Sequence, residues 1–311
     1  MKFWKNKKVL ITGASGFVGQ NLVKKLKEIG VKNLLTPSSS ELDLTSEASV
    51  KKYFESNKPG IVFHMAGKVG GIGINKEKPA EFYYDNAIMG LLITHYAYKT
   101  GVEKLVSVAA GCGYPLGLET PYAEEDFWKG LPDENSLGYS MAKKNLILQS
   151  WTYRKQYGFN STVLLPANIY GPHDNFNLDT SHVVPALIKK FIEAKKNNDN
   201  SVVVWGSGIA SREFLYVEDM VNVLVDIAEK YDESGPLNLG TGVETTIKEL
   251  IETIKEITEF EGEIVWDSSK PDGQIKRYYD MSKLEKTLGY VPSTKVKDGL
   301  IKTIKWYKNE Y

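Results

Sequence analysis

The sequence predicts an α/β protein, a doubly wound parallel β-sheet joined to a smaller C-terminal α/β lobe. Three observations favour this class. Short apolar segments alternate with longer amphipathic ones in the first half, a glycine-rich turn follows the first of them, and the alternation loosens after Leu165. We therefore expect one domain over residues 1–165, to which residues 215–240 return. The smaller lobe is expected over residues 166–214 and 241–311.

The composition is that of an ordinary globular protein and excludes several classes of function. Lysine plus arginine and aspartate plus glutamate both count 39 among 311 residues, so no net field favours nucleic acid or an anionic membrane. The single cysteine rules out an internal disulfide framework and fits a reducing compartment. The N-terminal residues lack the apolar core of a signal peptide, and no apolar run is long enough to span a bilayer. We expect a cytoplasmic protein without a metal site.

The glycine-rich turn after the first strand predicts a dinucleotide site. Residues 8–12 form a short apolar segment, and a helical pattern runs from Leu22 to Ile29. Between them, glycines let the backbone turn tightly and approach a pyrophosphate, which then lies at the helix N-terminus. A plain strand-to-helix turn is the structural alternative. The cofactor-binding residues expected here are Gly13, Ser15, Gly16, Phe17, Val18 and Gly19.

The segment after the second strand leaves the choice of cofactor open. After residues 33–35, neither an acidic residue for the ribose of NAD nor an arginine for the 2′-phosphate of NADP is present. Ser39 is a candidate for contact with a phosphate, or part of an ordinary loop. Asp43 is a candidate for the adenine end of the cofactor, or an acid before the N-terminus of the next helix.

The third strand is expected over residues 60–67 and ends in the small residues Ala66 and Gly67. Because open α/β sheets bind ligands at the C-terminal ends of their strands, both residues are candidate cofactor contacts. His64 is expected to pack within the strand. Residues 68–73 are predicted to form a glycine-rich loop suited to closing over a ligand.

A Tyr-x-x-x-Lys pair opens the helical run that follows the fourth strand. Four residues separate Tyr139 from Lys143, so both side chains lie on one face of a helix, a turn apart. An ammonium beside a phenol favours the phenolate and lowers the pKa of tyrosine, which gives a proton donor or acceptor near neutral pH. An ordinary amphipathic helix is the alternative, because such pairs are frequent by chance. The glycine turn upstream favours the catalytic interpretation.

A second helical segment predicts self-association. Residues 79–100 begin with Pro79 and carry apolar side chains nearly all round. Such a helix needs cover on both sides. We therefore expect a homodimer that forms through this helix and the helix over residues 139–157.

Taken in order, the glycine turn, the Tyr139/Lys143 pair and the Asn-Ile-Tyr-Gly-Pro segment 168–172 resemble the extended short-chain dehydrogenase/reductases. Within that family, the chain is similar to the GDP-L-fucose synthase branch over nearly its whole length. The motifs that carry this closer resemblance are residues 68–72, 171–176, 181–187, 203–208, 212–215 and 270–273. The resemblance implies a Rossmann domain with a substrate-binding lobe. It also implies an NADPH-dependent 3,5-epimerase and 4-reductase acting on GDP-4-keto-6-deoxymannose.

The resemblance implies catalytic roles for four residues. Tyr139 would protonate the C4 oxygen as NADPH delivers hydride to C4, and Lys143 would hold the nicotinamide ribose. Cys112 and His182 would be the acid/base pair of the epimerisation, which suits a thiol and an imidazole because protons next to a ketone are acidic. From the residues alone, a small buried hydrophobe is the favoured interpretation of Cys112, and a helix cap that of His182.

The resemblance also implies binding residues in the second half of the chain. Pro166 and Asn168 would contact the cofactor. Guanidinium groups suit a nucleotide diphosphate, whereas a solvated surface cation is the alternative for each charged residue. The candidate substrate-binding residues are Asn168, Lys190, Trp205, Arg212, Lys270 and Arg277.

The chain departs from the family pattern at two places. The family has a serine or threonine two residues before the catalytic cysteine, and its hydroxyl binds the C4 oxygen; here Ala110 stands there, followed by Gly111. The phosphate-binding arginines near the cofactor are also missing, so NADP is expected from the family and NAD stays open.

Several alternatives therefore remain. They are a UDP-sugar 4-epimerase, a reductase-only enzyme acting on a GDP-4-keto-deoxyheptose, and a noncatalytic NADP-binding protein. A 4,6-dehydratase is disfavoured, because no acidic residue adjoins Cys112.

Overall fold

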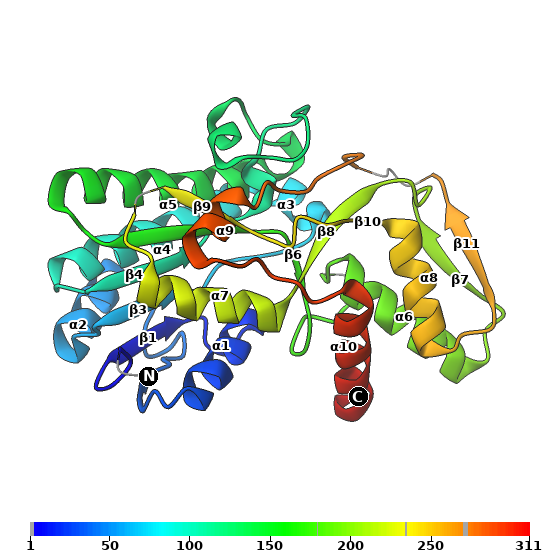
Figure 1. The fold of residues 1–311 in the computed structure, drawn as a ribbon, viewed down its shortest axis with the longest axis horizontal. Coiled ribbons are helices and arrows are strands. Elements are labelled where there is room, and N and C mark those ends of the chain that lie inside the picture. Colours follow the sequence, from blue (N-terminus) through cyan, green and yellow to red (C-terminus); the bar gives the residue numbers. More distant parts are fainter. Residues whose placement is uncertain (1–2, 179, 234, 270–272) are drawn as a thin grey trace.

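The computed structural model describes residues 3–178, 180–233, 235–269 and 273–311. Its larger part is built on a six-stranded parallel sheet with the order β2-β1-β3-β4-β5-β9 (Figure 1). The strands are β1 Lys8–Thr12, β2 Asn33–Leu35, β3 Ile61–His64, β4 Lys104–Val108, β5 Ser161–Pro166 and β9 Pro236–Leu239. Because β2 lies on one side of β1 and all later strands lie on the other, the predicted doubly wound sheet is confirmed.

Helices cover both faces of this sheet, because alternate strand residues point to opposite sides. Val9 and Ile11 join the core that also contains side chains of α1 and α7, whereas Leu10 joins the core of α2 and α4. α5 packs along α4. The helices are α1 Phe17–Glu28, α2 Glu47–Asn57, α4 Pro79–Lys99, α5 Leu137–Tyr157 and α7 Val217–Lys230. None of the helices in the described part of the chain is long and apolar enough to cross a membrane.

The smaller part has its own core and two short sheets. In one sheet β8 pairs with both β6 and β10, and in the other β7 pairs with β11. Side chains such as Phe191, Phe214 and Ile254 form the core between these strands and α6, α8 and α10. The elements are β6 Asn168–Tyr170, β7 Ser201–Trp205, β8 Ser211–Tyr216, β10 Glu244–Thr246, β11 Glu263–Asp267, α6 Val183–Asn197, α8 Ile247–Thr258 and α10 Val296–Glu310.

Two local expectations were wrong. The helix α9, Ser282–Leu288, was expected in the smaller lobe, but it packs against β9 and α7 because Leu284 belongs to the large core. The glycine-rich loop expected over residues 68–73 runs at Ile72 into a short helix, α3 Ile72–Glu77. Three 3-10 helices, η1 Gly111–Gly113, η2 Glu124–Trp128 and η3 Glu134–Ser136, lie between β4 and α5.

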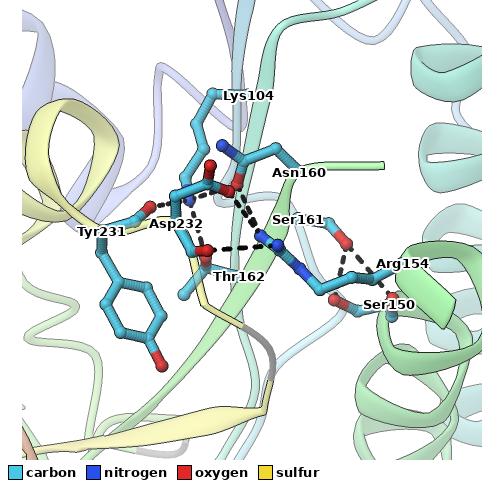
Figure 2. A network of polar contacts seen from close by, with 8 residues as sticks. All are labelled: Lys104, Ser150, Arg154, Asn160, Ser161, Thr162, Tyr231 and Asp232. Carbon is cyan, nitrogen blue, oxygen red and sulfur yellow. Dashed lines mark hydrogen bonds and ion pairs between the residues drawn. The ribbon is translucent and has the colours of Figure 1, made fainter. Parts of the chain in front are cut away.

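A network of polar contacts surrounds Lys104 at the N-terminal end of β4 (Figure 2). The Nζ atom of Lys104 donates to Asn160 Oδ1 at 2.7 Å, to Thr162 Oγ1 at 2.8 Å and to the carbonyl oxygen of Tyr231. Arg154 also donates to Asn160 Oδ1, at 2.9 Å. All three hydrogens of the Lys104 ammonium therefore have acceptors in the protein, and none is left to bind a ligand. The C-terminal ends of the strands lie at the opposite edge.

Candidate active site

The only cysteine lies where β4 ends, in the 3-10 turn η1, and α5 packs directly against this turn. The hydroxyl of Ser140 lies 3.1 Å from the carbonyl oxygen of Cys112 and 3.2 Å from its Sγ atom, as the donor to both. Since Ser140 follows Tyr139 in the chain, this contact holds the start of the α5 helix against the thiol. The structure thus brings Cys112 beside the Tyr139/Lys143 pair.

At the start of α5, Lys143 is buried and Tyr139 is half-buried. The Nζ atom of Lys143 lies 5.7 Å from the centre of the Tyr139 ring and donates to Val108 O, the last carbonyl of β4, at 3.2 Å. Burial lowers the pKa of Lys143 to about 8. An added Cβ at Gly67 would lie 3.4 Å from this Nζ atom, so the end of the β3 segment adjoins the pair.

The expectation that Lys143 lowers the pKa of Tyr139 was wrong for this state of the protein. Burial raises the pKa of Tyr139 well above its ordinary value, and charge on the Cys112 thiol raises it further. Lys143 is itself desolvated, which disfavours its charged form, so it contributes less positive charge to stabilise a Tyr139 phenolate. Tyr139 is therefore a neutral phenol that can donate a proton, and the phenolate is not its resting form.

The glycine turn forms a cradle in which side chains do not fit. Gly13 has φ +70°, and an added Cβ would lie 2.8 Å from the backbone of Ala66. An added Cβ at Gly19 would lie 2.0 Å from the carbonyl oxygen of Gly13. Gly16 is the N-cap of α1 and brings no side chain to that end, and Ser15 is exposed beside it. The turn and the first residues of α1, Phe17 and Val18, therefore offer backbone N–H groups to an anion.

The segment after β2 holds one carboxylate that the sequence did not single out. Glu41 accepts hydrogen bonds from the backbone N–H and the hydroxyl of Ser38, each at 2.8 Å, and these bonds lower its pKa. Ser39 is exposed next to it. Asp43 accepts from the backbone N–H and the hydroxyl of Thr45, which lowers its pKa and commits one of its oxygens to a local turn.

The two histidines singled out in the sequence have different surroundings. His64 is buried in β3 with Nδ1 2.8 Å from Thr12 Oγ1, and burial, aided by the charge of Lys143, lowers its pKa to about 3. It is a packed strand residue. His182 occupies the N-cap position of α6, but its side chain makes no capping hydrogen bond. His182 is exposed, and the protein that surrounds its imidazole lowers the pKa of that ring by desolvation.

The candidate substrate arginines are bound at two places, Arg277 beside Asn168 at the start of β6 and Arg212 within β8. Arg277 Nη2 donates to Asn168 Oδ1 at 3.2 Å, and Asn168 Nδ2 donates to the carbonyl oxygen of Glu213 at 2.9 Å. Arg212 Nη1 donates to the carbonyl oxygens of Ser211 and Gln274. Neither arginine is a fully solvated surface cation, because both are fixed by hydrogen bonds and partly buried.

Lys190 and Trp205 form a separate pair on the smaller lobe. Lys190 Nζ donates to Val203 O at 3.1 Å and lies 5.7 Å from the centre of the Trp205 ring, while burial lowers its pKa. Trp205 is 67% exposed, which is unusual for the largest aromatic side chain and suits stacking on a planar base. Lys270 lies outside the described residues.

Sequence reasoning missed three features of this region. Ser140 was hidden inside the Tyr-x-x-x-Lys motif, although its neighbour in the chain was singled out. Tyr279 lies 3% exposed with its hydroxyl directed at Pro166 O, 3.3 Å away, and nothing in its local sequence signals that contact. An open surface pocket of about 560 Å³ lies between residues 117–120 and 274–276, beside the backbone that binds Arg212. Within the described residues, no cluster of histidine, cysteine and carboxylate side chains is arranged to hold a metal ion.

A glycine turn after the first strand and a tyrosine next to a buried lysine at the end of the fourth define a dinucleotide-dependent oxidoreductase or epimerase. The chain belongs to the NAD dependent epimerase/dehydratase family, whose sequence model matches residues 9–240. The expected membership in the extended short-chain dehydrogenase/reductases is confirmed.

Relatives of two kinds resemble the chain along its length. A protein named putative GDP-L-fucose synthase 2 from Arabidopsis thaliana is 41% identical over 303 residues, which cover 97% of this chain and 92% of the relative. The crystal structure of a GDP-6-OMe-4-keto-L-xylo-heptose reductase from C. jejuni is 30% identical with a TM-score of 0.92, covering 98% of this chain and 99% of that one. A GDP-L-fucose synthetase from Naegleria fowleri bound to NADP is 29% identical with a TM-score of 0.90, covering 98% and 95%.

Proposed function

We propose that this protein is an NADPH-dependent reductase of a GDP-4-keto-6-deoxy sugar that also epimerises C3 and C5. The observation that carries the proposal is the contact of Ser140 with Cys112, which holds a thiol beside the Tyr139/Lys143 pair. A reductase alone needs only the pair. Acid/base exchange next to a ketone gives the thiol a task. Relatives named as a putative GDP-L-fucose synthase and as a reductase of a GDP-4-keto-heptose support the proposal that the substrate is a GDP-sugar.

The residues of the glycine turn and Lys143 fit the pyrophosphate and the nicotinamide ribose of a bound NADP. At Gly13 and Gly19 a side chain would clash with neighbouring backbone, so only glycine permits the tight turn that leads into α1, where a pyrophosphate would be bound. Lys143 has one acceptor among the described residues, Val108 O, so two of its hydrogens remain for the hydroxyls of a ribose. Bound NADPH would supply the hydride. NADH is the competing cofactor, because Glu41 places a carboxylate beside Ser39, where a 2′-phosphate would be repelled.

In reduction, Tyr139 donates its phenolic proton to the C4 oxygen while hydride reaches C4. Its raised pKa keeps that proton on the phenol until negative charge develops on the substrate oxygen. In epimerisation, Cys112 and His182 remove and return the protons at C3 and C5. Tyr139 then stabilises the enolate oxygen. Arg212 and Arg277 bind the diphosphate, and Trp205 stacks on the base.

The decisive experiment is incubation of the protein with GDP-4-keto-6-deoxymannose in D₂O, with NADPH and then with NADH. We expect NADPH oxidation, followed by absorbance, and deuterium at C3 and C5 of the product, followed by proton NMR. Oxidation of NADPH without deuterium uptake would favour the second candidate, a reductase-only enzyme, which the heptose reductase relative and Ala110 support. Binding of UDP in preference to GDP in a thermal-shift assay would instead favour the UDP-sugar epimerase.

We also propose a homodimer in a reducing compartment such as the cytoplasm. The exposed sides of α4 and α5 carry large apolar residues, with Tyr84 63% and Trp151 45% exposed, and the Trp151 ring stacks on Trp128 with centroids 6.0 Å apart. Two such helices from each subunit would form a four-helix interface. Sedimentation at micromolar concentration is expected to give a dimer, and Trp151→Glu a monomer. A wild-type monomer would end this proposal.

A further inference from the structure

The hydroxyl of Tyr279 fills the space that a side chain at position 111 would need. A Cβ added at Gly111 would lie 1.7 Å from that oxygen, 3.0 Å from the ring carbon that carries it and 3.3 Å from Pro166 O. Gly111 is not among the glycines with positive φ, so its backbone conformation is open to alanine. What excludes a side chain here is therefore Tyr279 and not the backbone.

Tyr279 is held from three directions, which fixes its hydroxyl. Its backbone N–H donates to Glu213 Oε2 at 2.9 Å, and its hydroxyl donates to Pro166 O at 3.3 Å. Its ring packs against Tyr114 with centroids 5.5 Å apart. Burial raises the pKa of Tyr279, so the phenol stays protonated and keeps its donor.

The Tyr279 hydroxyl lies between two parts of the site. Gly111 precedes Cys112 in the 3-10 turn, and charge on the Cys112 thiol is felt by the Tyr279 phenol. Pro166 is the last residue of β5, two positions before Asn168, which accepts a hydrogen bond from Arg277; both Pro166 and Asn168 are expected to contact the cofactor. One buried hydroxyl therefore lies between the turn that carries the thiol and the strand end expected to contact the cofactor.

We propose that Tyr279 is a positioning residue that acts through Gly111 and Pro166 to fix the Cys112 thiol relative to the cofactor segment. Ala110 has no side-chain hydroxyl that could fix this turn by a hydrogen bond. The Tyr279 phenol, which packs against Gly111, fixes the turn instead. The consequence for the reaction rests on the proposed function. The consequence for the thiol itself does not.

The test uses the fact that Cys112 is the only cysteine, so its alkylation by iodoacetamide can be followed by mass spectrometry without any substrate. Tyr279→Phe removes the hydroxyl and keeps the ring. We expect alkylation of Cys112 to be about threefold faster, with an altered pH profile, because the turn is released. Deuterium uptake at C3 and C5 should fall about tenfold, below the roughly hundredfold that a full ångström of misplacement costs. NADPH oxidation should fall less.

Tyr114→Phe is the matched control. It removes another buried hydroxyl from the same aromatic cluster, one that donates to Asn238 Oδ1 at 2.6 Å and does not touch Gly111. Its melting temperature should fall, but the alkylation rate and its pH profile should not change. A change of the same size in both variants would mean that Tyr279 only supports packing.

The second arm is a rescue. Gly111→Ala should clash with the Tyr279 hydroxyl and change alkylation of Cys112, whereas Gly111→Ala with Tyr279→Leu should return the rate toward that of the parent. Gly111→Ala with parental alkylation, or Tyr279→Phe with a parental rate and pH profile, would overturn the proposal. If Gly111→Ala does not fold, Tyr279→Phe against its control still decides. Failure of the parent to turn over the ketosugar would overturn the proposed function and leave the alkylation result standing.

Discussion

Two lysine–tyrosine pairs lie at the two ends of β4, and the distance from the ammonium to the ring centre is the same in both. Lys104, the first residue of β4, has its Nζ atom 5.7 Å from the centre of the Tyr231 ring. Lys143, which binds the last carbonyl of β4, has its Nζ atom 5.7 Å from the centre of the Tyr139 ring. Both ammonium groups are buried. Burial lowers the pKa to about 7 for Lys104 and to about 8 for Lys143.

The two pairs differ in how many hydrogens of the lysine ammonium remain free to bind a ligand. Lys104 uses three acceptors supplied by the protein, as Figure 2 shows, so it has no donor for a ligand. Lys143 has one protein acceptor in the described part of the chain and adjoins the open turn at Gly67. A perturbed pKa therefore marks both ends of the strand, but an unsaturated donor marks only the end that can bind a cofactor.

The largest difference between the two ends should come from the tyrosines. Tyr139→Phe removes the proton donor and should lower the rate of ketosugar reduction by about 10²–10⁴, with cofactor binding nearly unchanged. Tyr231→Phe is the matched control, because the Tyr231 hydroxyl is buried without a partner among the described residues. It should leave the rate unchanged and the protein no less stable. Single-turnover NADPH oxidation and cofactor titration measure both; equal rates for the parent and Tyr139→Phe would remove Tyr139 from the mechanism.

The lysines give the next largest difference. Lys143→Met removes a charge and two donors from the cofactor site, so kcat/KM should fall by about 10²–10³ and the affinity for NADPH should drop. Lys104→Met leaves the carbonyl of Tyr231 and the hydroxyl of Thr162 without their donor, so it should change the melting temperature and not kcat. A loss of activity in Lys104→Met that exceeds its loss of folded protein would break the distinction between the two ends.

The dependence of stability on pH should separate Lys104 from an ordinary lysine. The pKa of Lys104 is lower in the folded protein than in the unfolded chain, so between the two values the unfolded chain binds more protons. The free energy of unfolding should therefore rise with pH from about 7 toward 10.5, by on the order of a few kcal/mol. Lys104→Met should flatten this rise, measured by urea unfolding at a series of pH values. An unchanged slope would show that Lys104 stays ionised in the native state.

The sequence was sufficient for features with a local pattern. The spacing of Tyr139 and Lys143 and the glycines 13–19 follow from helix and turn geometry, and both are found where they were expected. The pKa of Tyr139 was predicted in the wrong direction, because spacing along a helix does not reveal how deeply the pair is buried. The contact of Tyr279 with Gly111 joins residues far apart in the chain, and no local pattern records it.

The smaller lobe was predicted least well, for a related reason. Its strands β6 and β10 have only three residues each, too few to show an alternating pattern, and they are stabilised by pairing with β8. Residues 282–288 were assigned to the wrong lobe, because the single buried leucine of the helix that they form does not indicate which core it enters. Local pattern thus indicated that a separate lobe exists, but not its short strands or how they pair.

The smallest expected effect is that of Ala110→Ser, which adds a donor to the unsaturated end of β4. Ala110 is the N-cap residue of η1, and its carbonyl oxygen already accepts the Gly113 N–H at 3.0 Å. A serine hydroxyl there has two choices. If it points to the C4 oxygen, reduction should gain up to about tenfold, below the 10²–10³ that one oxyanion donor contributes in a complete site. Deuterium uptake at C3 and C5 should barely change, because Cys112 and His182 carry that step and Tyr139 already donates to the enolate.

If the hydroxyl instead caps the N–H groups of η1, stability should rise and neither rate should change. Absorbance and NMR on one ketosugar sample, with a melting curve, separate these outcomes. A slower reduction in Ala110→Ser would contradict the distinction between an open end of β4 at Lys143 and a filled end at Lys104. It would mean that this end of β4 is already as full as the end at Lys104, with Tyr279 and Ser140 occupying the space in which a substrate oxygen and a new hydroxyl would have to meet.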